Sequence, residues 1–149
     1  MDLEIKNKKV SLVYRTRKIV KITDLLKGKN FEDLYFKALT DNNIEDLSKI
    51  IFIFGEDKDT GLSAFNNSEE VYDFLDDYME EKGKTYQDIF AEIAKNINKM
   101  GFFKTKMTEE ELESKMKNYM ALDMNEIVKS SAEKAITNVA QQEFKFSRG

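Results

Sequence analysis

The chain has 149 residues, of which 41% are hydrophobic and 35% are charged, with no His, no Cys and a formal net charge of −4. The absence of cysteine excludes disulfides and thiolate chemistry. The absence of histidine removes the commonest general base and the commonest transition-metal ligand. The sequence pI near 5.1 disfavours binding to duplex nucleic acid, which usually requires a basic face.

No segment predicts export or a membrane span. Residues 1–10 contain no apolar stretch of signal-peptide length. The longest apolar run, Ile50–Phe54, is far shorter than the roughly 20 residues that a membrane helix needs. We therefore expect a soluble intracellular protein.

The first fourteen residues predict a β-hairpin. Leu3 and Ile5 alternate with polar residues, as do Val10, Leu12 and Tyr14, which is typical of strands with one buried face. Residues 7–8 lie between the two runs, and Asn tolerates the positive φ of a tight hairpin turn. A hairpin alone is marginally stable in water, so one of its faces should pack on another element.

About five helices are expected to follow, which gives an α+β, predominantly α-helical fold. The first helix lies near residues 17–27. The third helix is apolar on most sides and should be the central buried element. Its end, residues 50–54, could instead form a strand. The predicted helix starts are Asn30, Asn43, Asn67 or Ser68, and the capping box Thr85–Asp88. The predicted helix stops are Gly28, Gly83 and Gly101.

The composition changes after residue 104, where large apolar residues become sparse. We predict a compact domain over residues 1–103 and a helical extension over 104–149, either loosely docked or ordered by a partner. Thr108 and Glu111 form a capping-box pattern at the start of this extension. The apolar residues of its predicted helices form narrow stripes that contain methionine, an adaptable contact residue. We predict that these stripes bind a partner through Leu112, Met116, Tyr119, Met120, Ile127, Ile136 and Val139.

Residues 57–68 resemble the start of a calcium loop but do not complete one. An EF-hand needs oxygen ligands at positions 1, 3 and 5, Gly at position 6 and Glu at position 12. Counted from Asp57, position 5 is Gly61, position 6 is Leu62 and position 12 is Ser68. We therefore predict a solvated loop in which Gly55 and Gly61 adopt unusual backbone angles.

Paired acids offer the nearest approach to a catalytic pattern. The pairs are Asp76–Asp77 and Glu80–Glu81 on the predicted fourth helix, and Asp77 and Glu81 lie one turn apart on the face opposite its apolar residues. Carboxylates on a solvated helix face are rarely catalytic. No nucleophile motif, phosphate-binding loop or metal-ligand cluster accompanies them. We expect no catalytic residue, no metal and no cofactor, and a protein that acts through interactions.

Four cations, Arg15, Arg17, Lys18 and Lys21, lie between the hairpin and the first helix. Cations oppose the macrodipole at a helix N-terminus, so their position suggests a role beyond helix stability. These four residues could bind an acidic protein partner or nucleic acid.

The order of the predicted elements resembles one known family. A hairpin ("MDLEIKNKKVSLVY") is followed at once by "RKIVKITDLLKG", "FEDLYFKAL" and an apolar helix, then by "SEEVYDFLDDYMEE" and "TYQDIFAEIAKNINKMGFFK". This layout resembles the tail assembly chaperones of long-tailed bacteriophages and prophages of Gram-positive bacteria. The resemblance covers residues 1–104 and depends mainly on segments 71–78 and 86–103.

The resemblance implies a non-enzymatic protein of the host cytoplasm, absent from the mature virion. Such chaperones coat the tape measure protein and recruit the tail tube protein, directly or through a longer frameshift product. Self-association, which would be head to tail, is also expected, whereas contact with a membrane or nucleic acid is not. The alternative is a small regulatory adaptor or nucleic-acid-associated protein that uses residues 15–21.

Overall fold

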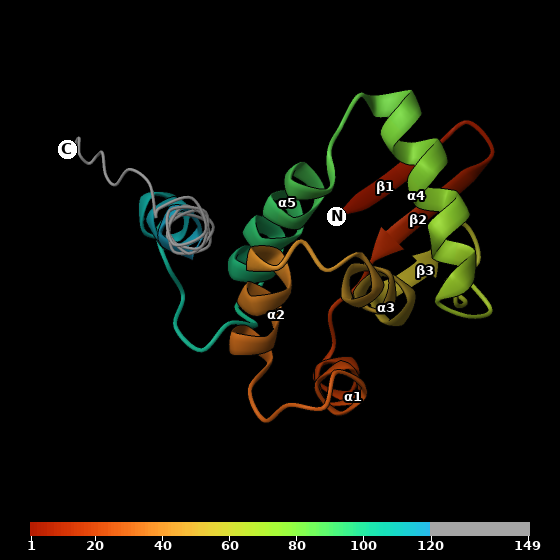
Figure 1. Cartoon of the computed structure of the whole chain (residues 1–149). Coiled ribbons are helices and arrows are strands. Elements are labelled where there is room, and N and C mark those ends of the chain that lie inside the picture. The colour runs from red at the N-terminus through yellow and green to blue at the C-terminus, as the bar shows by residue number, and fades with distance from the viewer. Residues whose placement is uncertain (120–149) are drawn as a thin grey trace, which may run out of the picture. The chain divides into compact units, whose positions relative to one another are not determined.

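The computed structural model describes residues 1–119 and has a mainly helical α+β fold (Figure 1). The elements are β1 (Asp2–Ile5), β2 (Lys8–Leu12), α1 (Thr16–Leu25), α2 (Phe31–Thr40), α3 (Ile44–Phe54), β3 (Gly55–Asp57), α4 (Glu69–Lys82) and α5 (Tyr86–Lys99). A further helix runs from residue 109 to the last described residue, 119. The contacts separate a first unit, Met1–Leu112, from the residues that follow it.

The strands form an antiparallel sheet in the order β1-β2-β3. The predicted hairpin is present, but its turn consists of residues 6–7, because Ile5 pairs with Lys8. Neither turn residue has a positive φ, so the predicted reliance on a left-handed Asn7 is wrong. The backbone N–H of Lys6 donates to a carboxylate oxygen of Glu81 on α4, which ties this turn to the neighbouring helix.

One face of the sheet is buried and the other is polar, as the alternation predicted. Leu3 and Val10, directly opposite each other, are both buried, and α4 packs against β1 on that side (Figure 1). On the polar side Lys58 forms ion pairs with Asp2 (2.8 Å) and Glu4 (2.6 Å). These pairs connect the loop after β3 to the first strand.

Strand β3 was not predicted. Residues 50–54 are helical, which settles the helix-or-strand question for that run, and the extended segment begins at Gly55. Gly55 has φ −75° and ψ 121°, so the prediction of an unusual backbone angle there is wrong. Glycine is needed for space instead, because a Cβ would lie 2.6 Å from the carbonyl oxygen of Ile51.

Most predicted helix boundaries are confirmed by capping hydrogen bonds. Asn30 and Asn43 each accept a backbone N–H bond at 3.0 Å, and Thr85 forms a reciprocal capping box with Asp88. Asn67, rather than the neighbouring N-cap Ser68, accepts the bond from Glu70 N–H. Because these side chains satisfy amides that the helix leaves unpaired, they define where the helices begin.

The glycine stops are confirmed at two of the three predicted positions. Gly83 and Gly101 have φ values of 65° and 81°. At the end of α1, however, the left-handed residue is Lys27, with φ 59°, and the N–H of Gly28 bonds to the carbonyl of Thr23 in a Schellman motif. Gly28 lies close to α2, because a Cβ there would meet the side chain of Leu34 at 2.5 Å and would require that side chain to move.

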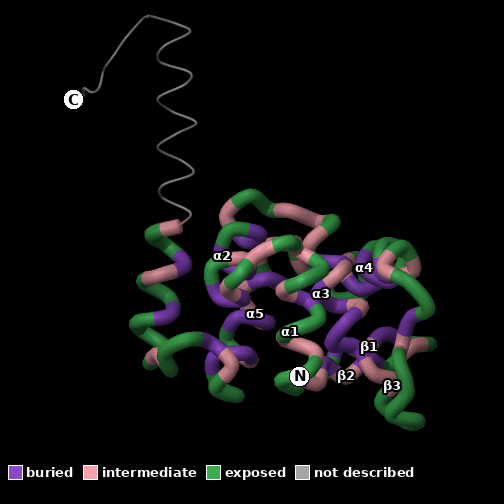
Figure 2. Tube along the Cα trace, turned by 90° about the horizontal axis from the view of Figure 1, so that it is seen from below, coloured by how far each residue is buried: buried purple, intermediate pink, exposed green. Residues whose placement is uncertain are grey.

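Helix α3 is the central element, as its composition predicted. It contacts α1, α2, α4 and β2, and Figure 2 shows buried residues along α2, α3, α5 and the strands. Aromatic rings fill the space between these helices. Phe103 returns from beyond α5 to stack on Phe31 and to contact Phe36 and Tyr35.

Two polar contacts hold the segment after α5 to the core. The side-chain amide of Asn98 bonds to both the carbonyl and the N–H of Met107, at 2.8 and 2.9 Å. The N–H of Lys104 donates to Glu32 at 2.8 Å. The predicted capping box at Thr108 and Glu111 then begins the next helix. Residues 104–112 therefore belong to the first unit.

We expect Phe103→Ala to lower the free energy of unfolding by roughly 3–5 kcal/mol, because a buried ring and its aromatic contacts are lost. Phe103 is only 6% exposed. Chemical denaturation followed by circular dichroism measures the change. Phe102→Ala is the matched control, since that ring is only partly buried and lies 6.2 Å from Tyr14. Equal losses in the two variants would contradict the assignment of Phe103 to the core.

Candidate functional site

The loop after β3 is organised by its own hydrogen bonds. The Asp57 carboxylate accepts bonds from the backbone N–H groups of Asp59 and Thr60, both at 2.9 Å, and Gly61 adopts φ 75°. This is an Asx turn, which uses the oxygen that a calcium loop would present to the metal. Among residues 1–119, no group of three or more His, Cys, Asp or Glu side chains is placed to hold a metal ion.

The loop also returns to the sheet instead of remaining a free connection. Ser63 pairs with Glu56 as an isolated bridge, and the N–H of Ala64 donates to the carbonyl of Gly55 at 3.1 Å. Leu62 lies at the start of this return, where its carbonyl accepts the N–H of Asp57, and its side chain leaves the residue 70% exposed. The predicted solvated loop is therefore present only around residues 58–62.

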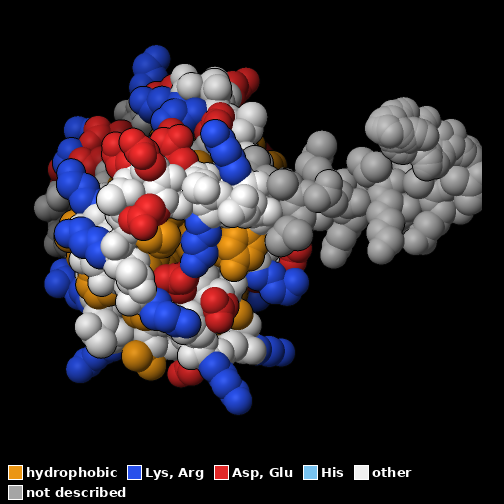
Figure 3. Space-filling view, turned by 90° about the vertical axis from the view of Figure 1, so that its left-hand side faces the viewer, with side chains coloured by type: hydrophobic (Ala, Val, Ile, Leu, Met, Phe, Trp, Pro, Cys, Tyr) orange, Lys and Arg blue, Asp and Glu red, His pale blue; other side chains and the backbone are white. Residues whose placement is uncertain are grey.

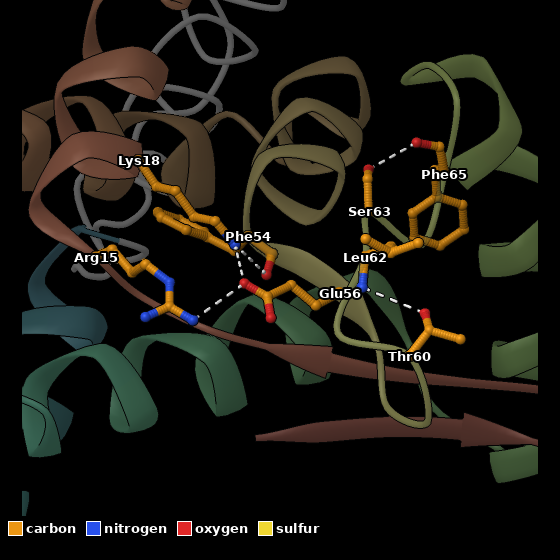
Figure 4. Close-up of polar contacts among 8 residues, drawn as sticks. All are labelled: Arg15, Lys18, Phe54, Glu56, Thr60, Leu62, Ser63 and Phe65. Carbon is orange, nitrogen blue, oxygen red and sulfur yellow. Dashed lines mark hydrogen bonds and ion pairs between the residues drawn. The ribbon is translucent and has the colours of Figure 1, made fainter.

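The four predicted cations lie at the start of α1, where Glu56 on β3 meets two of them (Figure 4). Lys18 Nζ lies 2.8 Å from a carboxylate oxygen of Glu56, and Arg15 lies 3.5 Å from the same oxygen. Lys18 also donates to the backbone carbonyl of Phe54 at 3.4 Å. Its hydrogen bond to Glu56 is the main reason that the pKa of this carboxyl group is lower than usual.

The remaining cations, Arg17 and Lys21, are exposed and form no ion pair within the described part of the chain. The N-cap Arg15 supplies no capping hydrogen bond, and the first turn of α1 has no acidic residue. The helix therefore starts with like charges opposed to its dipole. Glu56 on a different element partly compensates for this arrangement.

A hollow of about 350 Å³ opens beside these cations. Phe52 and Ile53 of α3 contribute its apolar part, and Gly61 and Ser63 of the loop border it. Three large apolar side chains outside its lining are exposed on α1 and on the loop after β3. Val20 and Leu25 on α1 are 56% and 41% exposed, in addition to Leu62.

The paired acids on α4 lie on an exposed face, as predicted. Asp76, Asp77, Glu80 and Glu81 are all exposed, and none of them forms an ion pair with another described residue. Catalysis by carboxylates needs convergent groups in a site from which water is excluded, and these side chains are spread along a solvated helix. Exposed Tyr72 lies one turn before Asp76 on α4.

Of the residues predicted to bind a partner, three are described. Leu112 is 1% exposed and lines a hollow with Met1 and Met107, so it packs inside the first unit. Met116 is 7% exposed and Tyr119 is partly exposed. The other predicted residues, Met120, Ile127, Ile136 and Val139, lie outside the described residues.

Charges of both signs are interspersed over the face drawn in Figure 3, and hydrophobic side chains form small separate areas between them. No described helix has the length and hydropathy of a membrane span. Comparison with models of protein families, with curated proteins and with solved structures finds no match.

Sequence reasoning found the cations but not the residues that surround them. Glu56 follows a helix and carries no local motif, and its role appears only when β3 pairs with β2 and places it beside α1. The helical spacing predicts Ile19, Ile22 and Leu26 as the apolar stripe of this helix, of which Ile22 is fully buried, and Val20 and Leu25 fall outside that stripe. Both are exposed in the structure.

We expect Glu56→Gln to lower the free energy of unfolding by about 1 kcal/mol at neutral pH, because Lys18 and Arg15 lose their shared carboxylate. The folded-state pKa of Glu56 is depressed. Its contribution is therefore complete above the ordinary glutamate pKa and disappears as the pH falls through the folded value. Denaturant unfolding at a series of pH values should show the difference between the variant and the wild type closing in acid.

The matched control is Glu80→Gln, which removes an exposed carboxylate without an ion pair among residues 1–119. It should change stability little at any pH. If Glu56→Gln still lowers the free energy of unfolding by the same amount below the folded-state pKa of Glu56, the ion pairs with Lys18 and Arg15 are not the cause of the loss.

Proposed function

We propose that the chain is a non-enzymatic tail assembly chaperone of a long-tailed bacteriophage or prophage. It coats the tape measure protein in the host cytoplasm and helps to recruit tail tube subunits, directly or through a longer product. It leaves before the virion matures. The observation that carries the proposal is the order of elements, a hairpin at the first residues followed directly by a compact set of helices.

The resemblance depends on two segments that contribute buried residues to the first unit. Segment 71–78 supplies the buried side of α4, and segment 86–103 supplies α5 and the returning Phe103. These patterns therefore reflect a specific packing arrangement as well as a helical period. A related chain with the same pattern would have to bury the same sides of both helices.

The surface of the described unit also suits a protein that binds by many weak contacts. Its large exposed hydrophobic residues are scattered over α1, α4, the loop after β3 and the end of α5, namely Val20, Leu25, Leu62, Tyr72 and Met100. A coat that must later be released needs contacts that are weak individually and strong together. Separate small apolar areas also keep the free protein from aggregating.

A nucleic-acid-associated role for residues 15–21 has weaker support. Glu56 engages two of the four cations, which reduces the charge available to phosphates. Exposed apolar side chains lie among the remaining cations. Salt-sensitive binding of duplex DNA by the purified chain would favour this alternative over a protein partner.

Co-expression tests the chaperone function. We expect the chain to keep the large, helix-rich protein encoded just downstream of its gene in solution, as a complex with many copies of this chain per client. Affinity purification and mass measurement give the stoichiometry. Co-expression of the client with an unrelated acidic protein of similar size is the control. A client that precipitates equally in both cases would refute the proposal.

The predicted binding residues are tested by Met116→Lys combined with Met120→Lys. We expect the paired substitution to abolish co-purification of the client, because charge replaces adaptable apolar contacts. The far-ultraviolet circular dichroism of the fold formed by residues 1–112 should remain. Retained client binding would show that these methionines are not the contact.

A further inference from the structure

A hollow of about 630 Å³ is lined by residues of the second half of α5 and of segment 106–112. Its apolar lining consists of Met1, Met107 and Leu112, and its charged lining includes three lysines. We call this hollow the α5 groove. Its volume is within the range of clefts that hold a ligand. The groove shares Leu112 with the predicted stripe of the extension, but most of its lining belongs to other elements.

The two sides of the groove are held together by Asn98, which is only 6% exposed. Its side-chain amide bonds to both the carbonyl and the N–H of Met107, at 2.8 and 2.9 Å. These bonds join α5 to the segment on the other side of the groove. The groove is therefore formed before a partner arrives, which lowers the entropy cost of binding.

The three lysines border the groove on both sides. Lys95 and Lys99 belong to α5, and Lys106 belongs to the segment that follows it. All three are exposed, and none of them forms an ion pair within residues 1–119. Lys95 and Lys99 are one turn apart on the same side of the helix, with a rise of about 6 Å between them.

The two carboxylates that line the groove are already compensated. Glu92 forms an ion pair with Lys84 at 2.6 Å. Glu109 lies with Glu110 and Glu111 in the first turn of the next helix, where the helix dipole stabilises negative charge. The three lysines are therefore the uncompensated charges of the groove.

We infer that the α5 groove binds a helix of another protein whose apolar stripe is flanked by carboxylates. The stripe packs against Met1 and Met107, which are partly exposed and adaptable in shape. Carboxylates one turn apart on the partner have the same rise as Lys95 and Lys99 and pair with them. A carboxylate on the other flank pairs with Lys106. This is recognition of a helix in a groove, and the inference does not rest on the chaperone proposal.

Charge and lining together favour this partner over others. A nucleic acid would use the lysines but has no apolar stripe to cover Met1 and Met107. A neutral apolar segment would leave the lysines without counter-charges. The net charge of −4 repels an acidic partner at long range, but salt screens charges separated by more than about 8 Å at physiological ionic strength. The nearby lysines therefore decide the contact.

Fluorescence anisotropy with the full-length chain and synthetic peptides tests the inference. The probe is a fluorescein-labelled peptide of about 18 residues, long enough to form a helix, with Leu at helical spacing and Glu on both flanks. One comparison peptide has Lys at every Glu position, and another has the residues of the acidic peptide in an order without a stripe. The acidic peptide should bind saturably and lose affinity as salt is added, and both comparison peptides should bind at least about tenfold more weakly.

Charge reversal identifies the groove as the binding surface. Lys95→Glu with Lys99→Glu should weaken binding of the acidic peptide about tenfold and should create binding of the basic peptide. Lys106→Glu alone should weaken binding of the acidic peptide about threefold, because an ion pair on the other side of the groove is lost. Lys27→Glu with Lys29→Glu changes the net charge equally at exposed positions outside the groove and should bind like the wild type.

New binding of the basic peptide shows that the variant reversed at positions 95 and 99 is folded. The inference is overturned if the wild type does not bind the acidic peptide, if the reversed variant keeps that binding, or if the basic peptide gains none. A labelled single-stranded oligonucleotide that binds more tightly than the acidic peptide, and only to the wild type, would assign the groove to nucleic acid instead. A sedimenting mass above 17.4 kDa for the wild type but not for the reversed variant would assign it to a second copy.

Discussion

The junction between Phe54 and Gly55 is the constraint on which the arrangement of the first unit depends. The Phe54 carbonyl accepts the N–H of Val13 at 2.9 Å, and the Phe54 ring contacts Tyr14 edge-on, with centroids 4.9 Å apart. Gly55 then turns the chain directly from helix to strand, where any larger residue would approach the Ile51 carbonyl. One short segment thereby joins the helical core to the sheet.

The charged surface beside α1 follows from this junction. Since β3 begins at Gly55 and pairs with β2, Glu56 lies within reach of Lys18 and Arg15. The polar end of α1 is thus held by a strand that is distant in sequence, while its outer side remains uncovered. Exposed apolar and basic side chains are placed together there because the inner side of α1 is used for contact with α3.

The absence of His and Cys shapes what the described surfaces can do. The remaining ionisable groups are carboxylates, amines, guanidiniums and phenols. On α4 the carboxylates are exposed and spread along the helix, and on α1 the cations share a single acid. Groups arranged in this way select partners by charge and set the salt dependence of binding.

Local sequence determined most element boundaries, because a cap needs only a few neighbouring residues. Asn30, Asn43 and Thr85 bond to amides three residues away, and such signals are readable without the rest of the chain. The hairpin and the buried sides of α4 and α5 were predictable for a similar reason, since periodicity identifies the apolar side of an element. The class of fold followed from these patterns.

Only the tertiary structure decided the remainder. Strand β3 has too few residues to show a period, and it is extended because β2 offers a pairing edge. Lys27 takes the left-handed position expected of Gly28, and Gly28 lies against the side chain of Leu34. Glu56 meets Arg15 and Lys18 because folding brings β3 beside the start of α1, which is distant in the sequence. The sequence alone determined each element's buried side, whereas which uncovered side chains became neighbours depended on long-range packing.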